Sequence, residues 1–132
     1  MPHVICEYSA NVEPKIRVDA LLEVLHNAMM RTGVVELGGL RTRAERREHY
    51  RIADNHPANG FVNVTVRVAK GRTPETRRLI AETVFADAHK HLEGLFAASP
   101  FVLSVEVQEI ETDFRIHTSN IRDWMKTRET AA

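Results

Sequence analysis

The stretch that decides the fold is FVNVTVRVA, residues 61–69, followed by KGRTPETR, residues 70–77. The first nine residues alternate between apolar and polar side chains. The apolar positions are Val62, Val64, Val66 and Val68. A period of two with one apolar face predicts a strand that packs one side on a core.

The second part of this stretch predicts a turn and the start of a helix. Thr73 suits a helix N-cap, Pro74 suits the first helical position, and Glu75 favours the positive end of the helix. Apolar residues then recur at helical spacing, which predicts a buried stripe of Ile80, Ala81, Val84, Phe85, Ala88 and Leu92. Residues 101–108 alternate again, so a second strand follows.

The first half of the chain has the same order of elements. His3–Tyr8 is short and β-prone and predicts a strand. Residues 18–30 predict an amphipathic helix that ends before Gly33. Its apolar stripe comprises Val18, Leu21, Leu22, Leu25 and Met29. Part of Leu40–Ala53 is expected to form the next strand.

Two strand–helix–strand units imply an α+β fold with a four-stranded mixed sheet and two helices on one face. We expect one domain over residues 1–132, built from duplicated units at about 1–57 and 58–110. Residues 111–132 show no core pattern and are expected to be an exchanged arm or a loose tail. The open face of the sheet is expected to be solvated or covered by another subunit.

Composition excludes several classes of protein. The chain has 132 residues and a formal net charge of zero, which argues against a broadly basic nucleic-acid binder. Its single cysteine, Cys6, excludes an intramolecular disulfide and is expected to be a small buried apolar residue. The sequence has no apolar run of membrane length and no secretory signal, so we expect a cytoplasmic protein.

Six collinear segments resemble one family. They are MPHVICEYS (1–9), TGVVELGGLR (32–41), RIAD (51–54), HPANGFVNVT (56–65), GRTPETR (71–77) and LSVEVQEI (103–110). The chain resembles the 5-carboxymethyl-2-hydroxymuconate isomerase family, which is related to 4-oxalocrotonate tautomerase in the tautomerase superfamily. The resemblance covers about residues 1–110.

This resemblance implies a homotrimer that needs no cofactor and no metal. The implied reaction is keto–enol, allylic proton transfer on 5-carboxymethyl-2-hydroxymuconate, in the breakdown of homoprotocatechuate from 4-hydroxyphenylacetate. It also implies that Pro2 is the catalytic base and that Arg41 and Arg72 bind and polarise a small anionic di- or tricarboxylate substrate. His3 is expected either to line the pocket or to pack at the start of its strand.

The chemistry of these residues is consistent with that role. Pro2 becomes the amino terminus if Met1 is removed, and desolvation with nearby cations favours the neutral, basic form of an amine. Antiparallel packing of the two units would bring Pro2 and Arg72 to one edge of the sheet. Most prolines after an initial methionine have no catalytic role, and a solvated loop is the commoner environment for a single arginine such as Arg72. The objection is stronger for Arg41, because Arg41 begins an arginine-rich run.

Two other functions remain open. One is a keto–enol tautomerase that acts on a smaller 2-hydroxy-dienoate. The other is a non-catalytic anion-binding module that uses residues 41–51 as a basic surface. The histidine pairs are not expected to bind metal, and Tyr50, Phe114 and Trp124 are expected either to wall a pocket or to pack between subunits.

Overall fold

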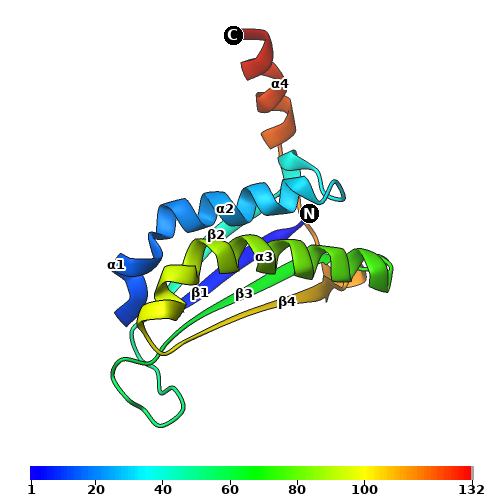
Figure 1. Ribbon diagram of the computed structural model, residues 1–132. Coiled ribbons are helices and arrows are strands. Elements are labelled where there is room, and N and C mark those ends of the chain that lie inside the picture. Colours follow the sequence, from blue (N-terminus) through cyan, green and yellow to red (C-terminus); the bar gives the residue numbers. More distant parts are fainter. Residues whose placement is uncertain (132) are drawn as a thin grey trace.

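The computed structural model describes residues 1–131 and contains both expected strand–helix–strand units (Figure 1). The first unit comprises β1 (His3–Ser9), α2 (Val18–Arg31) and β2 (Arg41–Arg47), and the second comprises β3 (Gly60–Ala69), α3 (Pro74–Ala98) and β4 (Phe101–Ile110). The shorter elements are η1 (Ala10–Val12), α1 (Glu13–Ile16), η2 (Leu37–Gly39), η3 (Thr112–Phe114) and α4 (Ile121–Ala131).

The four strands form one mixed sheet in the order β2-β1-β3-β4. Strands within each unit are parallel, and the two units meet through the antiparallel pair β1 and β3. Figure 1 shows α2 and α3 side by side over one face of this sheet. The predicted α+β architecture is therefore confirmed.

The core lies between the sheet and the two long helices. The four alternating valines of β3 are fully buried, as are Leu21, Leu25 and Met29 of α2. Cys6 is buried on the same face of β1, and burial raises the pKa of its thiol to about 12. The other face of the sheet carries polar and charged side chains from all four strands.

Helix α3 begins as its sequence predicts, because Thr73 accepts a hydrogen bond from the backbone N–H of Thr76 (3.1 Å). The prediction that Phe85 is buried was wrong, since its side chain is 41% exposed. Ile80, Val84, Ala88 and Leu92 already fill the face that meets the sheet, and Phe85 lies about 100° further round the helix. There it stacks on His89, with ring centroids 5.6 Å apart.

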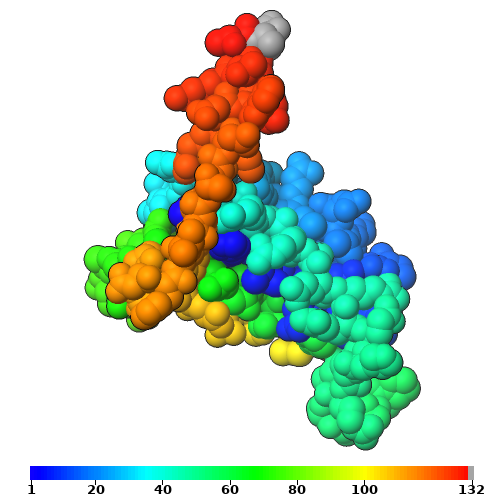
Figure 2. Space-filling view, turned by 180° about the vertical axis from the view of Figure 1, so that it is seen from behind, coloured from blue at the N-terminus to red at the C-terminus, as the bar shows by residue number. Residues whose placement is uncertain are grey.

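Residues 111–131 form a C-terminal arm. Figures 1 and 2 show α4 projecting away from the sheet and helices. Phe114 is 89% exposed and Trp124 is 55% exposed, whereas Tyr50 packs edge-on against Phe61. Among the described residues, none of the helices is both long and apolar enough to cross a membrane.

Candidate functional site

The residues singled out from the sequence meet at one end of the sheet. The register pairs His3 with Arg67, so the start of β1 lies beside the end of β3, close to Arg72. His3 also pairs with Arg41 on the other side. Pro2 is buried, and its carbonyl accepts a hydrogen bond from the backbone N–H of Arg41 (3.2 Å).

His3 lies between two arginines on the open face of the sheet. Arg41 Nη2 is 3.0 Å from His3 Nε2, and Arg43 Nη1 is 3.1 Å from His3 Nδ1. Burial, followed by the positive charges of Arg41, Arg43, Arg67 and Arg115, lowers the pKa of His3 to about 4. A neutral imidazole has one acceptor nitrogen, so His3 accepts a hydrogen bond from one arginine and orients its guanidinium.

The guanidinium of Arg41 has an unused hydrogen-bond donor. Its Nε atom is buried and has no hydrogen-bond partner in the described part of the chain. Burial lowers the pKa of Arg41, as do the neighbouring charges of Arg115 and Arg43. A buried donor without a partner is costly, and an anion bound beside Arg41 would satisfy it.

Arg72 is held by backbone carbonyls. It follows Gly71, whose φ of +109° suits the turn between β3 and α3. Its Nη1 donates to the carbonyl of Ala69 (3.3 Å) and its Nη2 to the carbonyl of Val34 (3.1 Å). The guanidinium therefore bridges the end of β3 and the loop after α2 while keeping its charge uncompensated.

The amino terminus lies among these cations. Burial lowers the pKa of the Met1 amine, and the charges of Arg72, Arg115, Arg122 and Arg41 lower it further, in that order of effect. Pro2 is more deeply buried than Met1. If Met1 were removed, an amine on Pro2 would lie near the same charges, which would favour its neutral form.

Sequence reasoning missed part of this site, because it expected residues 111–132 to be an exchanged arm or a loose tail and named neither Arg115 nor Arg122 as a site residue. A hollow at the base of the arm is lined by Met1, Gly38, Gly39, Arg41, His117, Ser119, Ile121 and Arg122. Figure 2 shows this base, in orange, beside dark-blue residues of the N-terminal segment. The concentration of cationic and polar residues over 115–122 was the available signal, but no periodicity connects it to the amino terminus.

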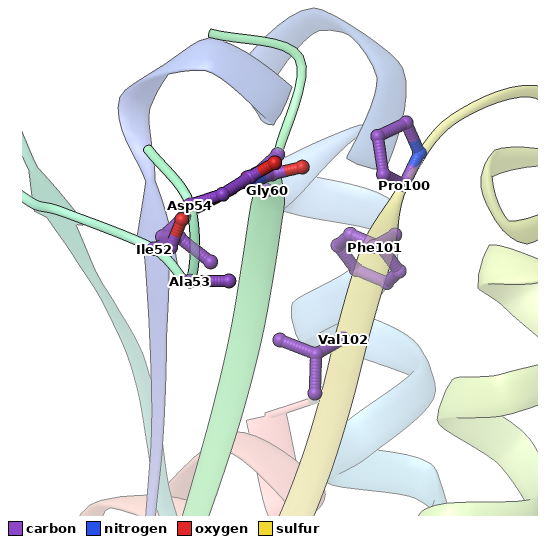
Figure 3. Close-up of a pocket in the computed structure, with 8 residues that line it drawn as sticks. Ile52, Ala53, Asp54, Gly60, Pro100, Phe101 and Val102 are labelled. Carbon is purple, nitrogen blue, oxygen red and sulfur yellow. Dashed lines mark hydrogen bonds between the residues drawn. The ribbon is translucent and has the colours of Figure 1, made fainter. Parts of the chain in front are cut away.

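A second hollow opens at the opposite end of the sheet, where β3 and β4 begin. In Figure 3, Ile52, Ala53 and Asp54 face the start of β4 at Pro100–Val102. Its lining includes the carboxylate of Asp54, which accepts a hydrogen bond from Asn59 (2.8 Å), and includes no cationic side chain. This hollow is therefore unsuited to a substrate that carries several carboxylates.

The histidines expected not to bind metal have separate partners. His91 Nε2 lies 2.9 Å from the carbonyl oxygen of Ile16, whereas His89 stacks between Phe85 and Phe96. Within residues 1–131, no group of three or more His, Cys, Asp or Glu side chains is placed to hold a metal ion.

The chain has the tautomerase fold, in which two similar strand–helix–strand units share one sheet, and cations surround its amino terminus. A fused 4-OT solved as a symmetric trimer has this fold, with a TM-score of 0.63 and 18% identity over 89% of this chain and 92% of that one. A 5-carboxymethyl-2-hydroxymuconate isomerase from Deinococcus radiodurans R1 is more similar. Its crystal structure gives a TM-score of 0.87 at 29% identity, covering 94% of this chain and 93% of that one.

The sequence comparisons identify the family. The 5-carboxymethyl-2-hydroxymuconate isomerase family model matches residues 2–125. The Escherichia coli 5-carboxymethyl-2-hydroxymuconate Delta-isomerase is 25% identical over 126 residues, which cover 96% of this chain and all of that protein. The chain belongs to the 5-carboxymethyl-2-hydroxymuconate isomerase family and is an isomerase.

Proposed function

We propose that this chain isomerises 5-carboxymethyl-2-hydroxymuconate, in cytoplasmic breakdown of homoprotocatechuate, with Pro2 as the base. Met1 is removed first, which leaves the ring nitrogen of Pro2 as the amino terminus. The observation that carries this proposal is the position of the amino terminus, which lies among Arg41, Arg72, Arg115 and Arg122. Family membership supports the choice of substrate.

The reaction is an internal proton transfer. Neutral Pro2 takes the proton from the 2-hydroxyl group, and the electron pair of that O–H bond enters the conjugated system as a dienolate. The protonated amine then returns a proton to carbon, which forms a C–H bond and leaves a conjugated ketone. No atom or electron is gained or lost overall, and the base is regenerated.

The arginines hold the anion and stabilise its charge. In support of carboxylate binding by Arg41 and Arg72, neither has a carboxylate within 4.0 Å among the described residues. Guanidinium groups that are already held in position can stabilise the dienolate without reorganising. His3 stays neutral and positions Arg41.

We propose that the working form is a homotrimer, and that the single domain arose from the two similar units. The symmetric trimer of the fused 4-OT neighbour supports this assembly. The open, polar face of the sheet is the surface that other subunits would cover.

The test compares two forms of one chain and one variant. Chains with and without Met1 are separated and verified by intact mass, and loss of dienol absorbance is followed in the ultraviolet. We expect turnover from the form without Met1 and a loss of about 100-fold or more in the form with Met1, because an amide nitrogen is not basic. Pro2→Ala, processed to a primary amine, should stay folded and trimeric and lose most of the rate.

The alternatives predict different results. A tautomerase for smaller dienoates would turn over the analogue that lacks the carboxymethyl group at least as well as the full substrate. A non-catalytic anion-binding module would bind the dienol without changing its absorbance. Equal turnover with and without Met1 would refute the role of Pro2.

A further inference from the structure

We propose that residues 115–122, here called the cationic segment, bind the third carboxylate of the substrate and select it over dicarboxylates. This inference rests on the proposed function, and it assigns a role to the arm that no sequence motif indicated. The residues responsible are Arg115, which precedes α4, and Arg122, which lies in the first turn of α4.

Both arginines reach the amino terminus from the arm. Arg115 Nη1 lies 3.5 Å from Met1 Sδ. Arg122 crosses Gly38 and Gly39 so closely that a Cβ added to Gly38 would lie 2.5 Å from Arg122 Cγ. A Cβ on Gly39 would lie 3.2 Å from the Met1 nitrogen and 3.3 Å from Arg122 Nη2. These two glycines allow the arginine and the amine to approach the same space.

The charge around this space is unbalanced. Arg41 contacts an imidazole, Arg72 donates to carbonyls, and Arg115 donates to a thioether sulfur. Within residues 1–131, Glu36 is the one carboxylate paired with an arginine of this group, and it binds Arg122 Nη2 at 2.6 Å. Arg41, Arg72 and Arg115 are therefore held near one another without a paired carboxylate among the described residues, which indicates a site that an anion completes.

His117 supports the same conclusion. It lines the hollow at the base of the arm, and desolvation followed by the charges of Arg115, Arg41, the amino terminus and Arg122 lowers its pKa. Arg41 and the amino terminus come from other parts of the chain than the segment that carries His117, Arg115 and Arg122, so the convergence of these groups is a property of the fold.

Removal of Met1 would complete the site. The Met1 side chain is the partner of Arg115, and Met1 is part of the lining of the hollow. Without it, Arg115 loses its thioether contact and faces the space in front of Pro2. Arg41 and Arg72 then suit the two carboxylates of the dienoate chain, and the cationic segment suits the carboxymethyl group.

The experiment uses the full chain without Met1, verified by intact mass. Arg115→Gln and Arg122→Gln are combined, and Arg128→Gln is the matched control, because Arg128 lies on the same helix but does not line the hollow. The substrates are 5-carboxymethyl-2-hydroxymuconate and the analogue that lacks the carboxymethyl group. We expect the double variant to lose about 10- to 100-fold in kcat/KM on the tricarboxylate, mostly through KM, and less than about 3-fold on the dicarboxylate.

An equal loss on both substrates, or no loss on either, would overturn the inference while leaving the proposed function intact. The control should behave as the unsubstituted chain. Folding of the double variant is checked by circular dichroism, and Arg122→Lys, which keeps the charge, should restore part of the preference for the tricarboxylate.

A binding measurement separates this inference from the proposed function. Calorimetry compares tricarballylate with glutarate, which has the same carbon chain but lacks the central carboxylate. We expect tighter binding of tricarballylate, and loss of this preference in the double variant, even if the unsubstituted chain turns over neither dienol. Equal binding of the two acids by the unsubstituted chain would refute the third-carboxylate site.

Discussion

Protonation of His3 should destabilise the folded chain, and His3→Gln should remove that effect. The imidazole faces Arg41, Arg43, Arg67 and Arg115, and its pKa in the folded chain is about 4 against 6.5 for an ordinary histidine. Between these two pH values the unfolded chain binds more protons. The stabilisation from neutral His3 is therefore fully present above pH 6.5 and is lost as the pH falls toward 4.

The difference between the two pKa values sets the size of the effect. It corresponds to at most about 3.5 kcal/mol, at about 1.4 kcal/mol for each pKa unit. The ring is partly exposed, and solvent screening reduces this to about 1–2 kcal/mol. Protonation of other groups also lowers the free energy of unfolding in acid. The measured quantity is therefore the difference in acid-induced loss between the unsubstituted chain and His3→Gln.

Urea denaturation at pH 7.5 and pH 4.0 measures the free energy of unfolding of each chain. We expect the unsubstituted chain to lose about 1–2 kcal/mol more than His3→Gln over this interval. Arg43→Gln removes one neighbouring charge and should raise the pKa of His3, which nuclear magnetic resonance titration of the imidazole reports directly. Identical acid sensitivity in the unsubstituted chain and His3→Gln would refute this account of His3.

Three further substitutions test the physical basis of the stability of the fold. Thr73→Ala removes the hydrogen bond to the Thr76 N–H and should cost about 1 kcal/mol in urea denaturation, whereas Thr73→Ser should change little; equal losses would contradict a capping role. Gly60→Ala places a Cβ 2.3 Å from Val12 Cγ1 and should lower the free energy of unfolding by about 1–3 kcal/mol. Gly94→Ala, in open space on α3, should instead raise the thermal midpoint, with a gain of about 0.5–1 kcal/mol, and a loss there would show that helix propensity does not control this position.

The sequence was sufficient to predict the fold, because the periodic patterns that indicate strands and helices are local. The alternating valines of β3 and the cap at Thr73 are visible over a few residues, and both lie where expected. Phe85 was misjudged because its apolar character fits the helical stripe as well as the outer face. The origin of the two units by duplication stays a prediction.

For the site, the sequence predicted that Pro2 and Arg72 share one edge of the sheet, because antiparallel packing of two parallel units makes strand starts and strand ends neighbours. That inference needed only the order of elements, and the register of β1 and β3 places the residues accordingly. The catalytic roles of Pro2, Arg41, Arg72 and His3 stay predictions that the kinetic experiments test.

The amino-acid sequence by itself determined the strand–helix–strand units, the buried faces and the composition of the edge that carries Pro2. Only the tertiary structure decided that Arg115 and Arg122 reach the amino terminus from the opposite end of the chain. The physical reason is that periodic burial specifies which side chains enter the core, whereas the path of an exposed arm depends on a few long-range contacts. The Glu36–Arg122 ion pair and the close approach at Gly38 are two of them, and neither has a local signature.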